Sequence, residues 1–135
     1  MISFRPRARR EAGQPGASLD RFPAVRQELK RILANLERIA ARGENAFLDP
    51  DDEVNYLAGS QLIINFDDLV RNRLPVSVRE SHPDIPWRQI SRTRNMLAHE
   101  YLSADRAIVW IAVSKELPEL VRTLLEERLG AGRDQ

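Results

Sequence analysis

The chain has 135 residues, of which 42% are hydrophobic and 30% charged, with a formal net charge of +1 and no cysteine. This length and balance are typical of one globular domain with its own core, and the lack of cysteine excludes disulfides and thiolate metal sites. No apolar run approaches the roughly 18 residues of a membrane span, no secretory signal is evident, and we expect a cytoplasmic protein without membrane attachment.

The charge is unevenly distributed along the chain. Residues 1–20 carry four arginines and two acids, a sum of +2, so residues 21–135 total −1. Bulk charge therefore does not predict a protein that coats nucleic acid. Between Arg71 and Arg94, however, six arginines face only two acids, a local sum of +4. This segment predicts either a basic patch or a solvated helix face.

The N-terminal residues differ in composition from the rest. Residues 1–18 are rich in Arg, Pro, Gly and Ala and show no apolar periodicity, which predicts a flexible basic arm. The remaining pattern predicts one helical domain over residues 19–130.

The first predicted helix follows this arm. Apolar residues recur at three- and four-residue steps from Phe22 to Ala40, which indicates a long amphipathic helix. Asp20 or Ser18 can cap its start, and Gly43 can end it.

A second helix is predicted from Asp49 to about Arg73. Asp49 suits the N-cap, Pro50 suits the first helical position, and the acids at 51–53 suit the positive end of the helix dipole. The same acidic cluster could alternatively bind a metal. The apolar stripe that begins at Val54 is broad, so we expect this helix to be central in the fold.

The remaining elements are also helical. Residues 75–86 are predicted to form a connection that can include a short helical turn, in which His82 is structural or inert. Pro86 opens a third helix, Ser103 or Asp105 caps a fourth, and Pro118 should kink or split the last one before it ends near Gly130. No strand alternation is present, so the predicted fold is all-α, a four- to five-helix up-down bundle.

The most informative stretch of the chain is Arg94-Asn95-Met96-Leu97-Ala98-His99-Glu100-Tyr101. An arginine can hold phosphate in a bidentate fork, and a histidine can take and give a proton near neutral pH. On a regular helix, Arg94 and His99 point about 140° apart. They can act together only if the helix ends or distorts near His99, or if the site combines residues from two chains.

A purely structural interpretation of the same residues stays open. Arg94 could pair with an acid, and His99 could sit at a helix C-terminus, where a cation is favoured. Tyr101 could be a residue at the edge of the core with its hydroxyl at the surface.

The motif resembles a known signature. Arg94-Asn95-x-x-x-His99-x-Tyr101 is similar to the signature of the HEPN superfamily, and specifically of HepT-like toxins. Asp84-Ile85-Pro86-Trp87 resembles the family's segment before the motif, and Leu117-Pro118-Glu119-Leu120 resembles part of its final helix. The resemblance covers roughly residues 20–129. The chain departs from the pattern at Ile63-Ile64-Asn65-Phe66, where family members often carry an Ile-Gly-Glu-Ala-like stretch that includes an acid.

The resemblance implies a helical homodimer that cuts RNA without a metal or other cofactor. It implies a partner as well, a small nucleotidyltransferase (MNT-type) antitoxin that silences the toxin by adding AMP to the motif tyrosine. Carried over by position, Arg94 and His99 are the catalytic pair, Asn95 assists, and Tyr101 is the AMPylation target.

Two further candidates and two further functions complete the predictions. Arg88 and Arg92, in the basic segment before the motif, are candidates for substrate binding. A second possible function is a non-catalytic HEPN-type module that binds RNA, a nucleotide or a nucleotidyltransferase. The polar motif residues disfavour a third, a purely structural dimerisation bundle.

Overall fold

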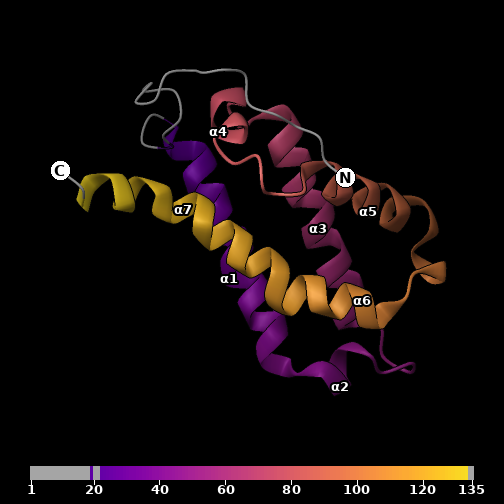
Figure 1. Ribbon diagram of the computed structural model, residues 1–135. Helices are drawn as coiled ribbons and strands as arrows, with labels where there is room; N and C mark the ends of the chain where they lie inside the picture. The colour runs from indigo at the N-terminus through magenta and orange to yellow at the C-terminus, as the bar shows by residue number, and fades with distance from the viewer. Residues whose placement is uncertain (1–18, 20–21, 134–135) are drawn as a thin grey trace.

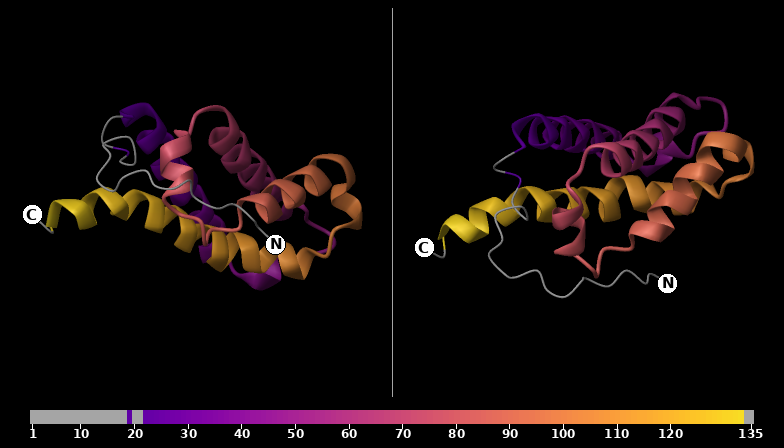
Figure 2. Two further views of the ribbon diagram at one scale, coloured as in Figure 1. Left: turned by 45° about the horizontal axis from the view of Figure 1, so that its top comes forward. Right: turned by 90° about the horizontal axis from the view of Figure 1, so that it is seen from above.

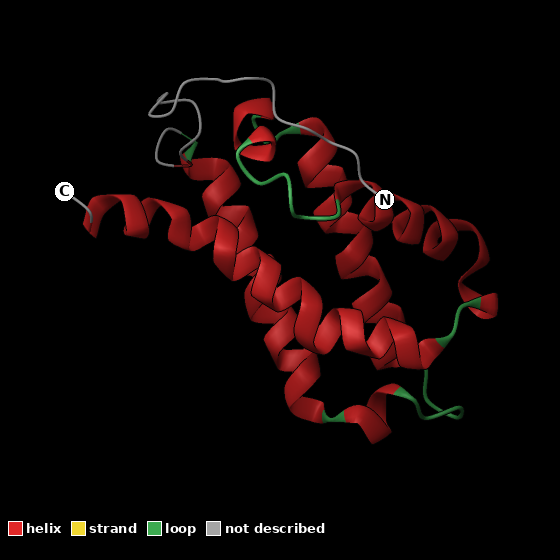
Figure 3. Cartoon of the chain, viewed as in Figure 1, coloured by secondary structure: helices red, strands yellow, loops and turns green. Residues whose placement is uncertain are grey.

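The computed structural model describes residues 19 and 22–133, with side chains as far as Glu126. These residues form helices connected by short loops, and no strand occurs among them (Figures 1 and 3). The predicted all-α class is confirmed. The elements are α1 (Pro23–Arg42), α2 (Glu44–Phe47), α3 (Val54–Asn72), α4 (Val76–Glu80), α5 (Trp87–Glu100), a 3₁₀ turn (Tyr101–Ser103), α6 (Arg106–Ile111), a π-helical turn (Ala112–Glu116) and α7 (Leu117–Arg133).

The longer helices pack as an antiparallel bundle with α3 at its centre. Helix α3 contacts α1, α5 and α6, and α1 also packs against α7 (Figure 2). The C-terminal end of α1 meets the start of α3 through a hydrogen bond from Arg42 Nη1 to Asn55 Oδ1 (2.9 Å). Apolar side chains of all these helices close one core, and Phe47, Tyr56 and Phe66 are its largest fully buried members. The prediction of a central second helix is correct.

Helix α1 agrees with its predicted bounds. Its apolar positions at three- and four-residue steps are buried, and Gly43 ends it at φ 95°, a conformation that side chains with a Cβ rarely adopt. The proposed caps Ser18 and Asp20 lie outside the described residues.

The predicted start of α3 at Asp49 is wrong. The helix begins at Val54, and Glu53 is its N-cap residue without a side-chain cap. Asp49 instead accepts the backbone N–H of Asp51 (2.8 Å), and Asp52 accepts that of Val54 (3.1 Å). These aspartate side chains accept hydrogen bonds from backbone N–H groups of the turn that leads into the helix. Short polar side chains can form such local hydrogen bonds in place of helical ones. The four-residue helix α2 was not predicted.

The last helix is continuous but irregular. Asp105 caps α6 by accepting the backbone N–H of Ala107 (3.0 Å), so of the two predicted caps Asp105 is the one used. A π-helical turn over Ala112–Glu116 then leads into α7, whose second residue is Pro118. A proline lacks the amide donor and crowds the preceding turn, and a π-turn is one way to accommodate it. The predicted distortion by Pro118 is therefore present without a break.

Candidate functional site

Helix α5 carries the predicted motif, and its start is anchored by the segment before it. The buried Trp87 donates from Nε1 to the backbone carbonyl of His82 (3.0 Å). The His82 ring nitrogen Nδ1 lies 3.0 Å from the carbonyl oxygen of Val78 in α4. The Ile-Pro-Trp segment thus fixes where α5 begins, and His82 belongs to this anchor.

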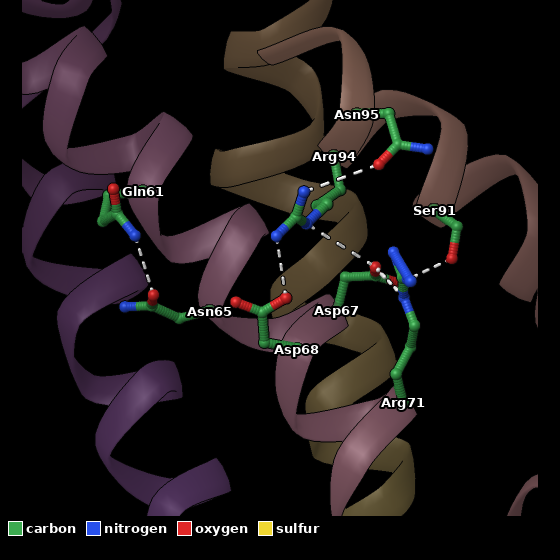
Figure 4. A network of polar contacts seen from close by, with 8 residues as sticks. All are labelled: Gln61, Asn65, Asp67, Asp68, Arg71, Ser91, Arg94 and Asn95. Atoms are coloured by element: carbon green, nitrogen blue, oxygen red, sulfur yellow. Dashed lines mark hydrogen bonds and ion pairs between the residues drawn. The ribbon is translucent and has the colours of Figure 1, made fainter. Parts of the chain in front are cut away.

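Arg94 points from α5 toward α3 and lies between two carboxylates (Figure 4). Its Nη2 donates to Asp68 Oδ1 at 3.0 Å, and its Nε lies 3.9 Å from Asp67 Oδ2. Its Nη1 is 3.5 Å from Oδ1 of Asn95. The Arg94 side chain is 23% exposed, so its guanidinium is half-buried in this acidic setting. The pairing of Arg94 with acids, which the structural interpretation anticipated, is present.

Asp67 is the centre of this network. Its Oδ2 accepts from Arg71 Nε (2.9 Å) and its Oδ1 from Ser91 Oγ (2.7 Å), which joins α3 to α5 (Figure 4). The Asp67 side chain is only 2% exposed. A buried carboxylate is costly unless it is paired and hydrogen-bonded, and here cations and a hydroxyl surround it.

A second set of predicted site residues faces solvent on α5. Steps of four, three and four residues separate Arg88, Arg92, Asn95 and His99, so on a helix they lie within an arc of about 60°. All four are exposed. The stripe that they form, named here the α5 polar stripe, is about 16 Å long, enough to contact more than one phosphate of a nucleic-acid strand.

Within this single chain, Arg94 and His99 remain on different faces of α5. The helix is regular through both residues and ends at Glu100, one residue after His99. The helix end therefore does not bring the two side chains together. Arg94 faces α3 while His99 is exposed, as the 140° separation on a regular helix requires.

Tyr101 lies directly after α5, where a buried tyrosine of α3 fixes the chain. The Tyr56 hydroxyl donates to the backbone carbonyl of Tyr101 (2.6 Å), and the two rings are 6.4 Å apart. Burial raises the pKa of Tyr56 above its ordinary value of 10.0. The Arg106 guanidinium lies 4.5 Å above the Tyr56 ring and pairs with Glu53 (3.0 Å). Tyr101 itself is half-buried.

Asp67 and Asp68 are members of the site that were not predicted from the sequence. Asp67 lies on the buried face of α3, beside Phe66 and Val70, and an acid at such a position must have partners. That signal was available in the sequence. Asn65, in the stretch that departs from the family pattern, instead accepts a hydrogen bond from Gln61 Nε2 (2.8 Å). The acids that reach Arg94 come two and three residues later.

The described residues provide neither a cluster of metal ligands nor a membrane-spanning helix. No group of three or more His, Asp or Glu side chains in them is arranged to hold a metal ion. In the same part of the chain, no helix is long and apolar enough to span a bilayer.

Comparison with known proteins places this chain in a family. The family model described as "Ribonuclease HepT-like" matches residues 29–126, which is more than half of the chain and includes Asp67, Arg94, His99 and Tyr101. No solved structure is matched significantly.

Two curated relatives carry related names. A "Putative RNase" of Caldanaerobacter subterraneus subsp. tengcongensis is 40% identical over 53 residues, which are 39% of this chain and 47% of the relative. The "Probable ribonuclease HepT" of Thermococcus cleftensis is 36% identical over 47 residues, 35% of this chain and 43% of the relative. The chain thus spans less than half the length of these relatives. The family model alone extends over most of the helical domain, and this chain belongs to the ribonuclease HepT-like family.

Proposed function

We propose that this protein is a metal-independent endoribonuclease and the toxin of a toxin–antitoxin pair. The observation that carries the proposal is the intact Arg94-Asn95-x-x-x-His99 motif in a ribonuclease HepT-like chain, with His99 exposed at one end of the α5 polar stripe. In this assignment RNA lies along the stripe, where Arg88 and Arg92 contact its phosphates and Asn95 assists.

The proposed reaction is cleavage through the ribose 2′-hydroxyl. The 2′-oxygen attacks the adjacent phosphorus, its proton passes to a base, and the bond to the 5′-oxygen breaks as that oxygen gains a proton. His99 serves as the base or the acid, a role typically worth about 10²–10⁴-fold. Arg94 holds the phosphate and offsets the charge that builds on its oxygens. The need for a 2′-hydroxyl selects RNA over DNA.

A homodimer is the second part of the proposal. Because one chain holds Arg94 and His99 on different faces of α5, two motif helices related by a two-fold axis would bring both kinds of group to one cleft. Exposed apolar side chains support such an interface. They lie on segments that meet near the His99 end of α5, namely Val54, Leu57, Leu102, Ile108 and Ile111. The Arg106–Glu53 and Tyr56–Tyr101 contacts hold these segments together.

Regulation by an antitoxin is the third part. By its position in the motif, Tyr101 is the residue to which a nucleotidyltransferase antitoxin adds AMP. Tyr101 follows the last residue of α5, so a bulky anionic group there would stand beside His99. Silencing would then follow from blocking the RNA-binding face.

The test is RNA cleavage by the Arg94→Ala and His99→Ala variants. We expect each to lose at least about 10²-fold in rate and to lose growth arrest in cells, while circular dichroism stays unchanged. Wild-type cleavage should persist in EDTA. If either variant cuts RNA as fast as the wild type, the catalytic assignment is wrong.

The same assay distinguishes the proposed endoribonuclease from the alternative function, a non-catalytic module. That module would bind RNA or a nucleotidyltransferase but would yield no cleavage products from wild-type protein freed of its antitoxin.

A further inference from the structure

Two adjacent carboxylates contact Arg94, and they differ sharply in burial. The Asp67 side chain is 2% exposed and the Asp68 side chain 46%. They also lie nearest to different nitrogens of the guanidinium. Asp67 faces Nε at 3.9 Å, whereas Asp68 accepts from the terminal Nη2 at 3.0 Å.

Asp67 has a fixed position. Ser91 and Arg71 hold its two oxygens at 2.7 and 2.9 Å, from α5 and from one turn along α3 (Figure 4). A change of rotamer would break both hydrogen bonds and leave a buried charge unpaired, which is costly. Asp67 therefore keeps the same orientation whether or not a ligand is present.

Asp68 is free to leave. It is half-exposed, and its contact with Arg94 is an ion pair at the surface, a kind of interaction that contributes little to stability. Rotation about its side chain would return the carboxylate to water at small cost. It occupies Nη2, one of the two terminal nitrogens with which Arg94 can hold a phosphate oxygen.

We propose that Asp68 is a built-in competitor of the RNA phosphate for Arg94, and that Asp67 is the positioning residue that holds Arg94 in place during the exchange. This inference rests on the proposed function of Arg94 as the phosphate-binding group. Without RNA, Asp68 occupies Nη2 of the guanidinium. With RNA, a phosphate oxygen accepts from Nη2 and Asp68 turns to solvent, while Asp67 keeps its charge beside Nε.

The decisive variant is Asp68→Asn, which keeps the shape of the side chain and removes its charge. Because a neutral amide pairs with Arg94 more weakly than a carboxylate and is displaced more easily by the phosphate, KM for RNA should fall about threefold to tenfold, with a smaller change in kcat. The Kd of a 2′-O-methyl RNA, which binds but lacks the nucleophile, should fall in parallel. The gain should shrink as salt is added, because salt screens charges near the surface.

A matched control is Glu37→Gln. Glu37 forms a comparable pair with Arg122 (2.9 Å) on α1 and α7, at similar exposure and away from α5. Glu37→Gln removes the same charge from the molecule as Asp68→Asn does, but away from α5. It should therefore leave KM and Kd for RNA unchanged. The gain from Asp68→Asn should also vanish in the Arg94→Ala background.

The positioning role of Asp67 predicts a different kinetic signature. Asp67→Asn should lower kcat at least about tenfold with a smaller effect on KM, because Arg94 keeps its charge but loses its fixed orientation. Ser91→Ala, which removes one of the two hydrogen bonds to Asp67, should lower kcat in the same direction by less. Thermal unfolding checks that each variant is folded, and Ser91→Ala decides the question if Asp67→Asn does not fold.

The outcomes separate this inference from the proposed function. If Asp68→Asn leaves KM and Kd unchanged or raises them, the competition is refuted. If the folded Asp67 and Ser91 variants keep wild-type kcat, the positioning role is refuted. Failure of the proposed function looks different, since in that case the wild type yields no cleavage products or Arg94→Ala cuts at the wild-type rate.

Discussion

Two residues five positions apart on a helix can have opposite environments, and this is the case for Arg94 and His99 of the motif. Arg94 is drawn toward α3 by two carboxylates, whereas His99 is exposed near the end of α5. One group is held by charge and the other is open to a ligand or to a second chain. The polar chemistry is therefore divided between two faces of one helix.

Tyr101 carries the regulatory prediction at the residue scale. With the cognate nucleotidyltransferase and ATP, Tyr101→Phe should gain no AMP and should stay toxic, because the acceptor hydroxyl is gone. Intact-mass spectrometry measures the adduct. Tyr56→Phe is the matched control, since Tyr56 is the only other tyrosine in the sequence and is fully buried. An AMP adduct on Tyr101→Phe would show that the acceptor lies elsewhere.

Tyr56 ties two elements together, and its hydroxyl gives a pH-dependent prediction at the element scale. Tyr56→Phe removes the bond to the Tyr101 carbonyl (2.6 Å) and should cost about 1–2 kcal/mol of unfolding free energy. Burial raises the folded pKa of Tyr56 above 10.0, so the folded state retains this proton better than the unfolded state does. The associated stability is present below pH 10 and is lost as pH rises through the folded pKa.

Urea unfolding at about pH 8 and about pH 11 measures this difference. The wild type should lose more stability over that interval than Tyr56→Phe, whose ring cannot ionise. Equal losses in the two proteins would contradict the assignment.

The crossing of α3 with its neighbours depends on a glycine. A Cβ at Gly59 would lie 2.8 Å from Phe47 Cε1 and 3.1 Å from Val113 Cγ2, both fully buried. Gly59→Ala should therefore destabilise the fold by about 1–3 kcal/mol, despite the higher helix propensity of alanine. Urea denaturation measures this loss of unfolding free energy. Ala58, the exposed residue before Gly59, serves as the control for helix propensity alone. Ala58→Gly should cost about 1 kcal/mol of unfolding free energy. Stabilisation by Gly59→Ala would refute this packing.

The helices themselves could be predicted because their signals are local. Gly43 ends α1 and Asp105 caps α6 through interactions with residues close in sequence. The start of α3 was placed wrongly at Asp49 for a local reason as well, because an aspartate before a helix can support a turn as readily as a cap. The prediction failed there because these two local solutions, a turn and a helix cap, use the same residue type.

At the scale of the whole molecule, the site depends on contacts between distant parts of the chain. Asp67 meets Ser91 and Arg94 across 24 and 27 residues of sequence, and periodicity within one helix does not encode such pairs. The motif residues and their separation onto two faces could be predicted from the sequence, but the acids that contact Arg94 depend on the packing of α5 on α3. That separation is the reason why we propose an active site shared by two chains.

Mixing two inactive variants tests this central claim most directly. Arg94→Ala and His99→Ala are purified separately, unfolded and refolded together, and RNA cleavage by the mixture is compared with cleavage by each variant refolded alone. A cleft shared across a two-fold axis predicts that heterodimers regain cleavage, because one chain supplies Arg94 and the other His99. Heterodimers that form, as shown by differently tagged chains, and still cut no RNA would contradict the shared site.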